Sequence, residues 1–135
     1  FNLRNPRKDA AIISFSGPAA NLILATILTV IIRVTYPYLF SYAGFLQFLT
    51  YVVALNVMWA IFNLIPIHPL DGGKVLVGLL PREHAYKVDA ILRQYGFIIL
   101  IFLIFPFFGS SPIIAIILPI INLILSILLP GTPLV

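Results

Sequence analysis

Long runs without a charged residue dominate this chain. One run covers residues 10–32, a second covers 34–70, and a third extends from 94 to 135 with a Pro-, Gly- and Ser-containing interruption at 106–112. A helix needs roughly 20 apolar residues to cross a hydrocarbon core. The pattern predicts helical spans at about 10–32, 45–65, 85–108 and 113–129. The predicted fold is an all-α integral membrane protein with about four transmembrane helices, in a single membrane domain over residues 1–135.

Composition supports a membrane environment. Hydrophobic residues make up 61% of the 135 residues and charged residues 9%, whereas soluble domains average about 45–50% and about 25%. The absence of cysteine excludes disulfides and thiolate metal ligands. The net charge of +4 would fit a nucleic-acid partner in isolation. Because the charges flank apolar runs, we expect the lipid bilayer as the partner and no nucleic acid.

The basic residues predict an orientation. They gather before the first span and between the second and third spans, namely at Arg4, Arg7 and Lys8 and at Arg82, Lys87 and Arg93. By the positive-inside rule, the N-terminus and a predicted loop at 81–93 face the cytoplasm. Four crossings would return the C-terminus to the cytoplasm as well.

The segment 63–73, N-L-I-P-I-H-P-L-D-G-G, departs from the apolar helical pattern. Two prolines interrupt regular helix, and glycines follow, so we expect the second span to be broken at 66–73. Irregular backbone at membrane depth is tolerated where it is buried in protein or lines a wet cavity. Asp71 lies in this segment, and an intramembrane carboxylate is a functional candidate by default.

The residues alone leave the role of Asp71 open. Its carboxylate could cap the helix that follows, or pair with Lys74 three residues on. It could equally be a metal ligand or a proton relay. The residue types do not decide between a structural role, as a cap or ion pair, and a functional role, as a metal ligand or proton relay.

Two motifs on successive spans resemble the site-2 protease family of intramembrane zinc metalloproteases. The first is S-G-P-A-A-N at 16–21, and the second is F-N-L-I-P followed by P-L-D-G-G within 62–73. The resemblance covers about the first 80 residues. It implies a protease of a prokaryotic cell membrane that cleaves transmembrane protein substrates, with Zn²⁺ as cofactor and Asp71 as the third protein ligand. The other ligands would be the histidines of an H-E-x-x-H helix, whose glutamate is the general base.

No H-E-x-x-H occurs in this sequence, whose histidines are His68 and His84. We expect the chain to be the C-terminal portion of a longer protease with that helix upstream, and the catalytic glutamate with it. A degenerate, inactive relative is the alternative. His68 is interpreted as a polar residue at the mouth of the cavity, with direct ligation or support of Asp71 as alternatives. His84 is interpreted as a solvated loop residue.

The resemblance also assigns roles to amides, prolines and glycines. Asn63 and Pro66 are expected to hold an extended substrate, since an unwound substrate helix needs hydrogen-bond partners in a dry site. Asn56 is interpreted as a hydrogen-bonding contact between helices. Structural support for the site is expected from Gly17, Pro18, Asn21, Gly72 and Gly73.

Two other functions compete with the protease. One is a catalytically inactive pseudoprotease that binds membrane helices, and the other is a transporter subunit with Asp71 as an ion or proton site. The transporter is disfavoured because the sequence offers one intramembrane carboxylate, no second broken helix in a matching position and no inverted repeat.

Overall fold

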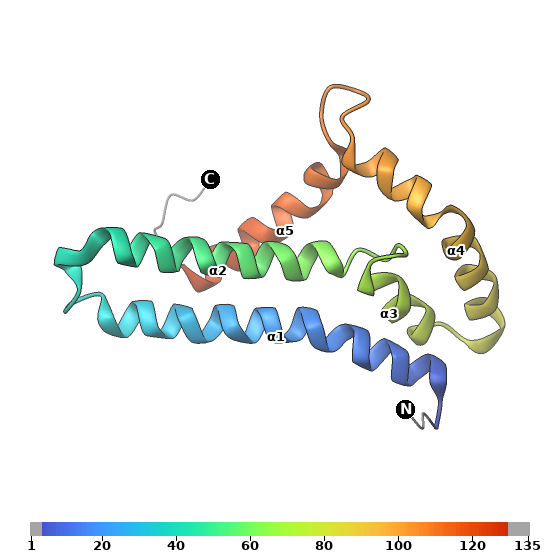
Figure 1. Ribbon diagram of the computed structural model, residues 1–135, viewed down its shortest axis with the longest axis horizontal. Helices are drawn as coiled ribbons and strands as arrows, with labels where there is room; N and C mark the ends of the chain where they lie inside the picture. Colours follow the sequence, from blue (N-terminus) through green and yellow to red (C-terminus); the bar gives the residue numbers. More distant parts are fainter. Residues whose placement is uncertain (1–3, 130–135) are drawn as a thin grey trace.

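The computed structural model describes residues 4–129, and every regular element among them is helical. The elements follow the chain in the order shown in Figure 1. They are α1 (Pro6–Thr35), the short 3-10 helix η1 (Phe40–Tyr42), α2 (Ala43–Asn63), α3 (Asp71–Leu79), α4 (Arg82–Ile104) and α5 (Pro112–Leu128). The prediction of an all-helical chain is confirmed.

A hairpin of two long helices forms the body of the molecule. Helices α1 and α2 run side by side in opposite directions, with η1 in the connection between them (Figure 1). Ala25 on α1 and Val53 and Val57 on α2 are fully buried in the core. Helix α5 completes that core with buried isoleucines and Leu125, one about every turn. Buried apolar contact therefore holds the hairpin and α5 together.

Arg33, near the end of α1, contacts the end of α5. Its guanidinium donates to the carbonyl oxygens of Leu128 at 2.8 Å and Ile127 at 3.3 Å. The last carbonyls of a helix have no partner within the helix, and a cation is favoured at that end. Arg33 therefore caps α5 from the end of α1.

Helix α3 packs against the first half of α1 and runs antiparallel to it. The side chain of Asp71, at the start of α3, lies near Gly17, whereas Gly78, near its end, lies against Ala11. A Cβ atom added to Gly78 would lie 2.2 Å from that of Ala11. Arg7 also donates to the carbonyl oxygens of Val77 and Leu80, which end α3. The missing side chain and the arginine together fix α3 on α1.

The break after the second long helix is shorter than predicted. Helix α2 ends at Asn63, residues 64–70 are not helical, and α3 begins at Asp71. The expected break at 66–73 is therefore wrong at its end, because Gly72 and Gly73 are helical and buried. A Cβ on Gly72 would lie 2.2 Å from the carbonyl oxygens of both Leu64 and Ile65. Gly72 therefore allows the start of α3 to lie close to the preceding backbone, and it does not break the helix.

The expected number of membrane spans is not confirmed. Helices α1 and α2 are long and apolar enough to cross a membrane by length and composition, whereas α5 has 17 residues and is a shorter apolar helix. Helix α4 does not meet the same measure, since its first half carries most of its charges. The predicted span at 85–108 and the predicted loop at 81–93 overlap, and the structure forms the helix: α4 begins at Arg82 and runs unbroken through the segment expected as a loop.

We predict that Gly78→Ala destabilises the protein by about 1–3 kcal/mol, the usual range for overpacking. The added Cβ would overlap that of Ala11 and push α3 away from α1. The loss of stability is measured as a decrease in the midpoint of thermal unfolding, with all variants in the same detergent. The control is Gly44→Ala, since nothing lies within 4 Å of a Cβ there. The exchanged pair Ala11→Gly/Gly78→Ala should regain part of the loss. Unchanged stability of Gly78→Ala would contradict this packing.

Candidate functional site

Asp71 is held at the interface between α3 and α1. It is the first residue of α3, and its side chain is partly buried. A Cβ on Gly17 would lie 3.7 Å from Oδ2 of Asp71, so the carboxylate faces α1 where α1 has no side chain. Gly17 is nine residues beyond Lys8, a rise of about 14 Å along the helix. The carboxylate thus lies well inside the length of a candidate span.

Neither structural explanation of Asp71 raised by the sequence is realised. The residue preceding α3 is Leu70, and no side-chain capping bond is made. Lys74 does not pair with Asp71, because the ion pairs within residues 4–129 both involve Asp89. Over the same residues, the Asp71 carboxylate makes no hydrogen bond. A partly buried carboxylate without a partner is available to an external cation or proton.

The glycines after Asp71 hold the start of α3 against the preceding segment. A Cβ on Gly73 would lie 2.6 Å from Nδ1 of His68 and 2.8 Å from its backbone nitrogen. The close approaches at Gly72 and Gly73 leave no room for a side chain between α3 and residues 64–68. Pro18 is fully buried within α1, and Asn21 is partly buried one turn beyond Gly17. The supporting role predicted for these residues stays a prediction.

The two residues expected to bind substrate lie at the end of α2 and in the segment after it. Asn63 is the last residue of α2, and its side-chain Nδ2 donates to the carbonyl oxygen of Trp59 at 3.0 Å. Its side-chain oxygen is an additional acceptor. Pro66 is exposed in the non-helical segment. Their contact with substrate also stays a prediction.

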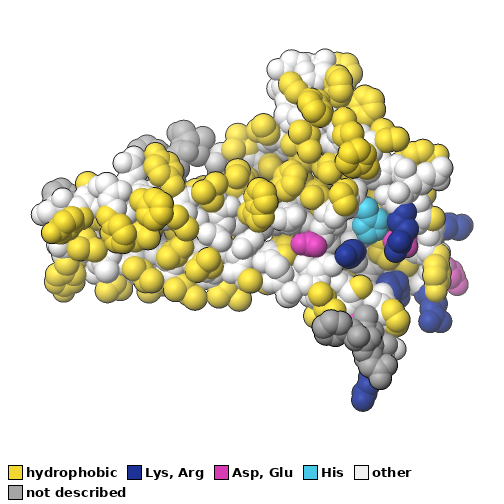
Figure 2. Space-filling model, viewed as in Figure 1, with side chains coloured by type: hydrophobic (Ala, Val, Ile, Leu, Met, Phe, Trp, Pro, Cys, Tyr) yellow, Lys and Arg dark blue, Asp and Glu magenta, His cyan; other side chains and the backbone are white. Residues whose placement is uncertain are grey.

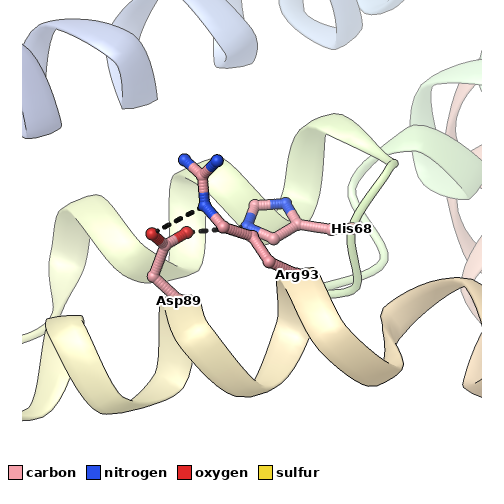
Figure 3. Close-up of polar contacts among 3 residues, drawn as sticks. All are labelled: His68, Asp89 and Arg93. Carbon is pink, nitrogen blue, oxygen red and sulfur yellow. Dashed lines mark hydrogen bonds and ion pairs between the residues drawn. The ribbon is translucent and has the colours of Figure 1, made fainter.

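His68 contacts α4 rather than Asp71. Its Nε2 lies 3.0 Å from Oδ1 of Asp89, and the other carboxylate oxygen of Asp89 accepts from Nε of Arg93 at 2.9 Å (Figure 3). The carbonyl oxygen of His68 would lie 2.5 Å from a Cβ on Gly96 of α4. The alternative in which His68 supports Asp71 is therefore not realised, since its ring is committed to Asp89. Residues 64–70 are instead fixed between α3 and α4.

Sequence reasoning missed Asp89 and Arg93. Both lie where the predicted span at 85–108 overlaps the predicted loop at 81–93, and no contact was predicted for either side chain. Asp and Arg four residues apart form a side-chain pair on a helix, and that spacing was the available signal. His84 is exposed as expected, but it lies on α4 and not in a loop.

A cavity of about 870 Å³ opens beside His68, between the start of α1, α3 and the first half of α4. Five cationic side chains and one carboxylate line it. The cations are Arg7, Lys8, Lys74, Arg82 and Arg93, and the carboxylate is that of Asp89. Figure 2 shows Lys and Arg side chains gathered around a histidine at this end of the molecule.

The chain supplies part of a zinc site at most. Zinc in enzymes takes three protein ligands from His, Cys, Asp or Glu and keeps one open position. No group of three such side chains gathers within residues 4–129, and the sequence has no H-E-x-x-H. The Asp71 carboxylate is a suitable oxygen ligand and has no competing partner. It therefore fits as one ligand of a set that these residues do not complete.

Comparison with known proteins identifies the family. Residues 39–103 match peptidase family M50. The chain is 33% identical over 113 residues to the proposed zinc metalloprotease YwhC of Bacillus subtilis (strain 168), covering 79% of this chain and 51% of that protein. It is 33% identical over 97 residues to the proposed zinc metalloprotease Rip2 of Mycolicibacterium smegmatis (strain ATCC 700084 / mc(2)155), covering 72% of this chain and 36% of that protein. No solved structure matches significantly.

The chain belongs to peptidase family M50, the family of the site-2 proteases. The resemblance inferred from the two motifs is thereby confirmed. The chain spans about half, or less, of the length of these curated relatives.

We predict that Asp89→Ala loosens residues 64–70. The variant removes the His68 contact, and a hydrogen bond of this kind contributes about 0.5–1.5 kcal/mol. Amide hydrogen exchange over 64–70 should quicken roughly two- to tenfold, since 1.4 kcal/mol is a factor of ten. Glu83→Ala, an exposed acid on the same helix, should leave exchange unchanged. Equal exchange in the two variants would mean that the His68–Asp89 contact does not restrain this segment.

Proposed function

We propose that this chain forms part of an intramembrane zinc metalloendopeptidase that hydrolyses peptide bonds of membrane-embedded substrates. The observation that carries the proposal is the Asp71 carboxylate, which is partly buried, faces Gly17 and has no partner within residues 4–129. Membership of peptidase family M50 supplies the class of reaction.

The apolar surface supports a membrane location. Large hydrophobic side chains are exposed along both candidate spans, such as Ile23 on α1 at 61% and Phe48 on α2 at 60%. Figure 2 shows many hydrophobic side chains spread along the visible face of this hairpin. Monomeric soluble proteins rarely expose large apolar patches, whereas lipid tails would cover the exposed side chains of these two helices. In the proposed orientation, the start of α1 and the charged half of α4 lie at the cytoplasmic side.

The cost of Asp71 supports its role as a metal ligand. A carboxylate at the centre of a membrane helix costs about 3 kcal/mol on insertion scales. A cap or an ion pair would offset this cost, but neither is made. A bound cation would offset it directly. The place of Asp71 in the first turn of α3, where the helix dipole favours an anion by about 0.3–1 kcal/mol, offsets only part of this cost. A metal-ligand role would offset the remainder.

The residues of this chain would act around the metal as follows. Asp71 would hold Zn²⁺ through a carboxylate oxygen, and Gly17 leaves the side of that carboxylate that faces α1 free of a side chain. Asn63 would offer hydrogen bonds to the backbone of an unwound substrate, with Pro66 beside it. Bound zinc lowers the pKa of a water molecule and polarises the scissile carbonyl. The remaining ligands and the general base would come from an H-E-x-x-H segment outside these 135 residues.

We predict that Asp71→Ala, in the protein expressed from its complete gene, lowers bound zinc and abolishes cleavage of a single-span membrane protein. Zinc per protein is measured by elemental mass spectrometry. Because Asp71 makes no bond within the described residues, thermal unfolding without metal should change little.

The matched control is Glu83→Ala, which removes an exposed acid from α4 and should leave zinc and cleavage unchanged. Full zinc occupancy in Asp71→Ala would overturn the ligand assignment. A complete gene without H-E-x-x-H, together with zinc-independent helix binding, would favour the inactive pseudoprotease.

We predict that Asn63→Ala reduces cleavage roughly two- to tenfold, the value of one hydrogen bond, with bound zinc unchanged. Asn56 is the matched control, because its Nδ2 also donates one turn back, to the Val52 carbonyl oxygen at 2.8 Å. Asn56→Ala removes the same kind of local bond away from the site. A similar loss of cleavage in both variants would assign Asn63 a structural role only.

A further inference from the structure

We propose that the cationic cavity binds the phosphate of an anionic phospholipid headgroup. The cavity has five cationic side chains and one carboxylate on its walls, and neither the proposed zinc site nor the proposed substrate contact uses it. The inference rests on the proposed membrane location but needs neither zinc nor peptidase activity.

The position of the cavity matches the level of lipid headgroups. Its walls include residues 5–8 at the start of α1 and His68 and Pro69, which follow the end of α2. These are the same end of an antiparallel pair of candidate spans. If α1 and α2 cross the bilayer, the cavity opens at one interface. Basic pockets between helices at the cytoplasmic interface bind anionic headgroups.

Several cations of the cavity are available to a ligand. Within residues 4–129, Lys8, Lys74 and Arg82 form no ion pair. Arg93 contacts Asp89 through Nε, and Figure 3 shows its two terminal nitrogens directed away from that carboxylate. Arg7 is partly engaged by the end of α3. Like charges gathered around one cavity repel each other, and a phosphate would relieve that repulsion with charge-assisted hydrogen bonds.

The surroundings favour a lipid over a soluble phosphate. One turn beyond Ala10, which lines the cavity, Ile13 is 53% exposed on α1. One turn beyond Arg93, Phe97 is 65% exposed on α4. Acyl chains attached to a bound headgroup would cover these side chains, whereas free phosphate would leave them uncovered. Tyr86, also on the wall, is a residue type enriched at the membrane interface.

The test compares lipid retention by native mass spectrometry of the protein expressed from its complete gene, purified in neutral detergent. The probes are dioleoyl phosphatidylglycerol and dioleoyl phosphatidylcholine in equal amounts. The unmodified protein should retain phosphatidylglycerol in preference. Lys74→Gln/Arg82→Gln should reduce that preference roughly tenfold or more, given about 1 kcal/mol for each basic residue near an anionic surface.

The matched control is Arg4→Gln/Lys87→Gln, which removes the same charge from exposed positions on α4 and before α1 that do not line the cavity. It should keep the preference. If both double variants lose the preference for phosphatidylglycerol equally, the overall positive charge of the protein attracts the lipid rather than a defined site. That result would overturn the proposal. No preference in the unmodified protein would also overturn it.

Two further arms complete the test. Glycerol 3-phosphate and inorganic phosphate, added without lipid, should not raise the thermal midpoint; stabilisation equal to that by phosphatidylglycerol would identify a soluble anion and overturn the lipid assignment. Lys8→Gln/Lys74→Gln repeats the measurement if the first variant does not fold. Bound zinc is measured on the same samples. An unmodified protein that holds zinc but shows no preference for phosphatidylglycerol would overturn this inference and leave the proposed function intact.

Discussion

The close approach of α3 to its neighbours is the constraint on which the rest of the structure depends. Gly78 lets α3 lie against Ala11, and Gly72 lets its start lie against the carbonyl oxygens of Leu64 and Ile65. A side chain at either position would move α3 away and would carry Asp71 with it. Because α3 is only nine residues long, it cannot be stable by itself. Its packing therefore determines where the carboxylate points.

The same packing connects the two candidate sites. Residues 64–70 lie between α3, where Gly73 meets His68, and α4, where Gly96 meets the His68 carbonyl. The His68–Asp89–Arg93 contacts fix this segment to α4 from the cavity side. Asp71 follows directly at the end of the segment. A movement of α4 would thus be transmitted to the Asp71 carboxylate through residues 64–70, which contact both α3 and α4.

Sequence reasoning predicted the helices well, because charge-free runs of membrane length leave few alternatives. It also selected Asp71 as a functional candidate from the conflict between a carboxylate and its apolar surroundings, and the role of Asp71 stays a prediction. It failed where packing decided the outcome. Gly72 and Gly73 were expected to extend the break, but they are helical, and their lack of a side chain lets α3 begin close against residues 64–68. The charges at 82–93 were placed partly in a loop and partly in the span at 85–108, because hydropathy does not distinguish a charged helix from a charged turn.

The Asp71 carboxylate and most cations of the cavity lie at different positions along α1. The candidate spans place an unpartnered carboxylate about 14 Å along α1 from Lys8, whereas the cations gather where α1 begins. Asp71 would be costly in lipid without a cation, and the cavity cations repel one another without an anion. Each site therefore carries unbalanced charge of opposite sign. Lys74 lines the cavity and is only three residues from Asp71, but no ion pair joins the two within the described residues. The two proposed ligands, a metal ion at Asp71 and a phosphate in the cavity, would satisfy both sites.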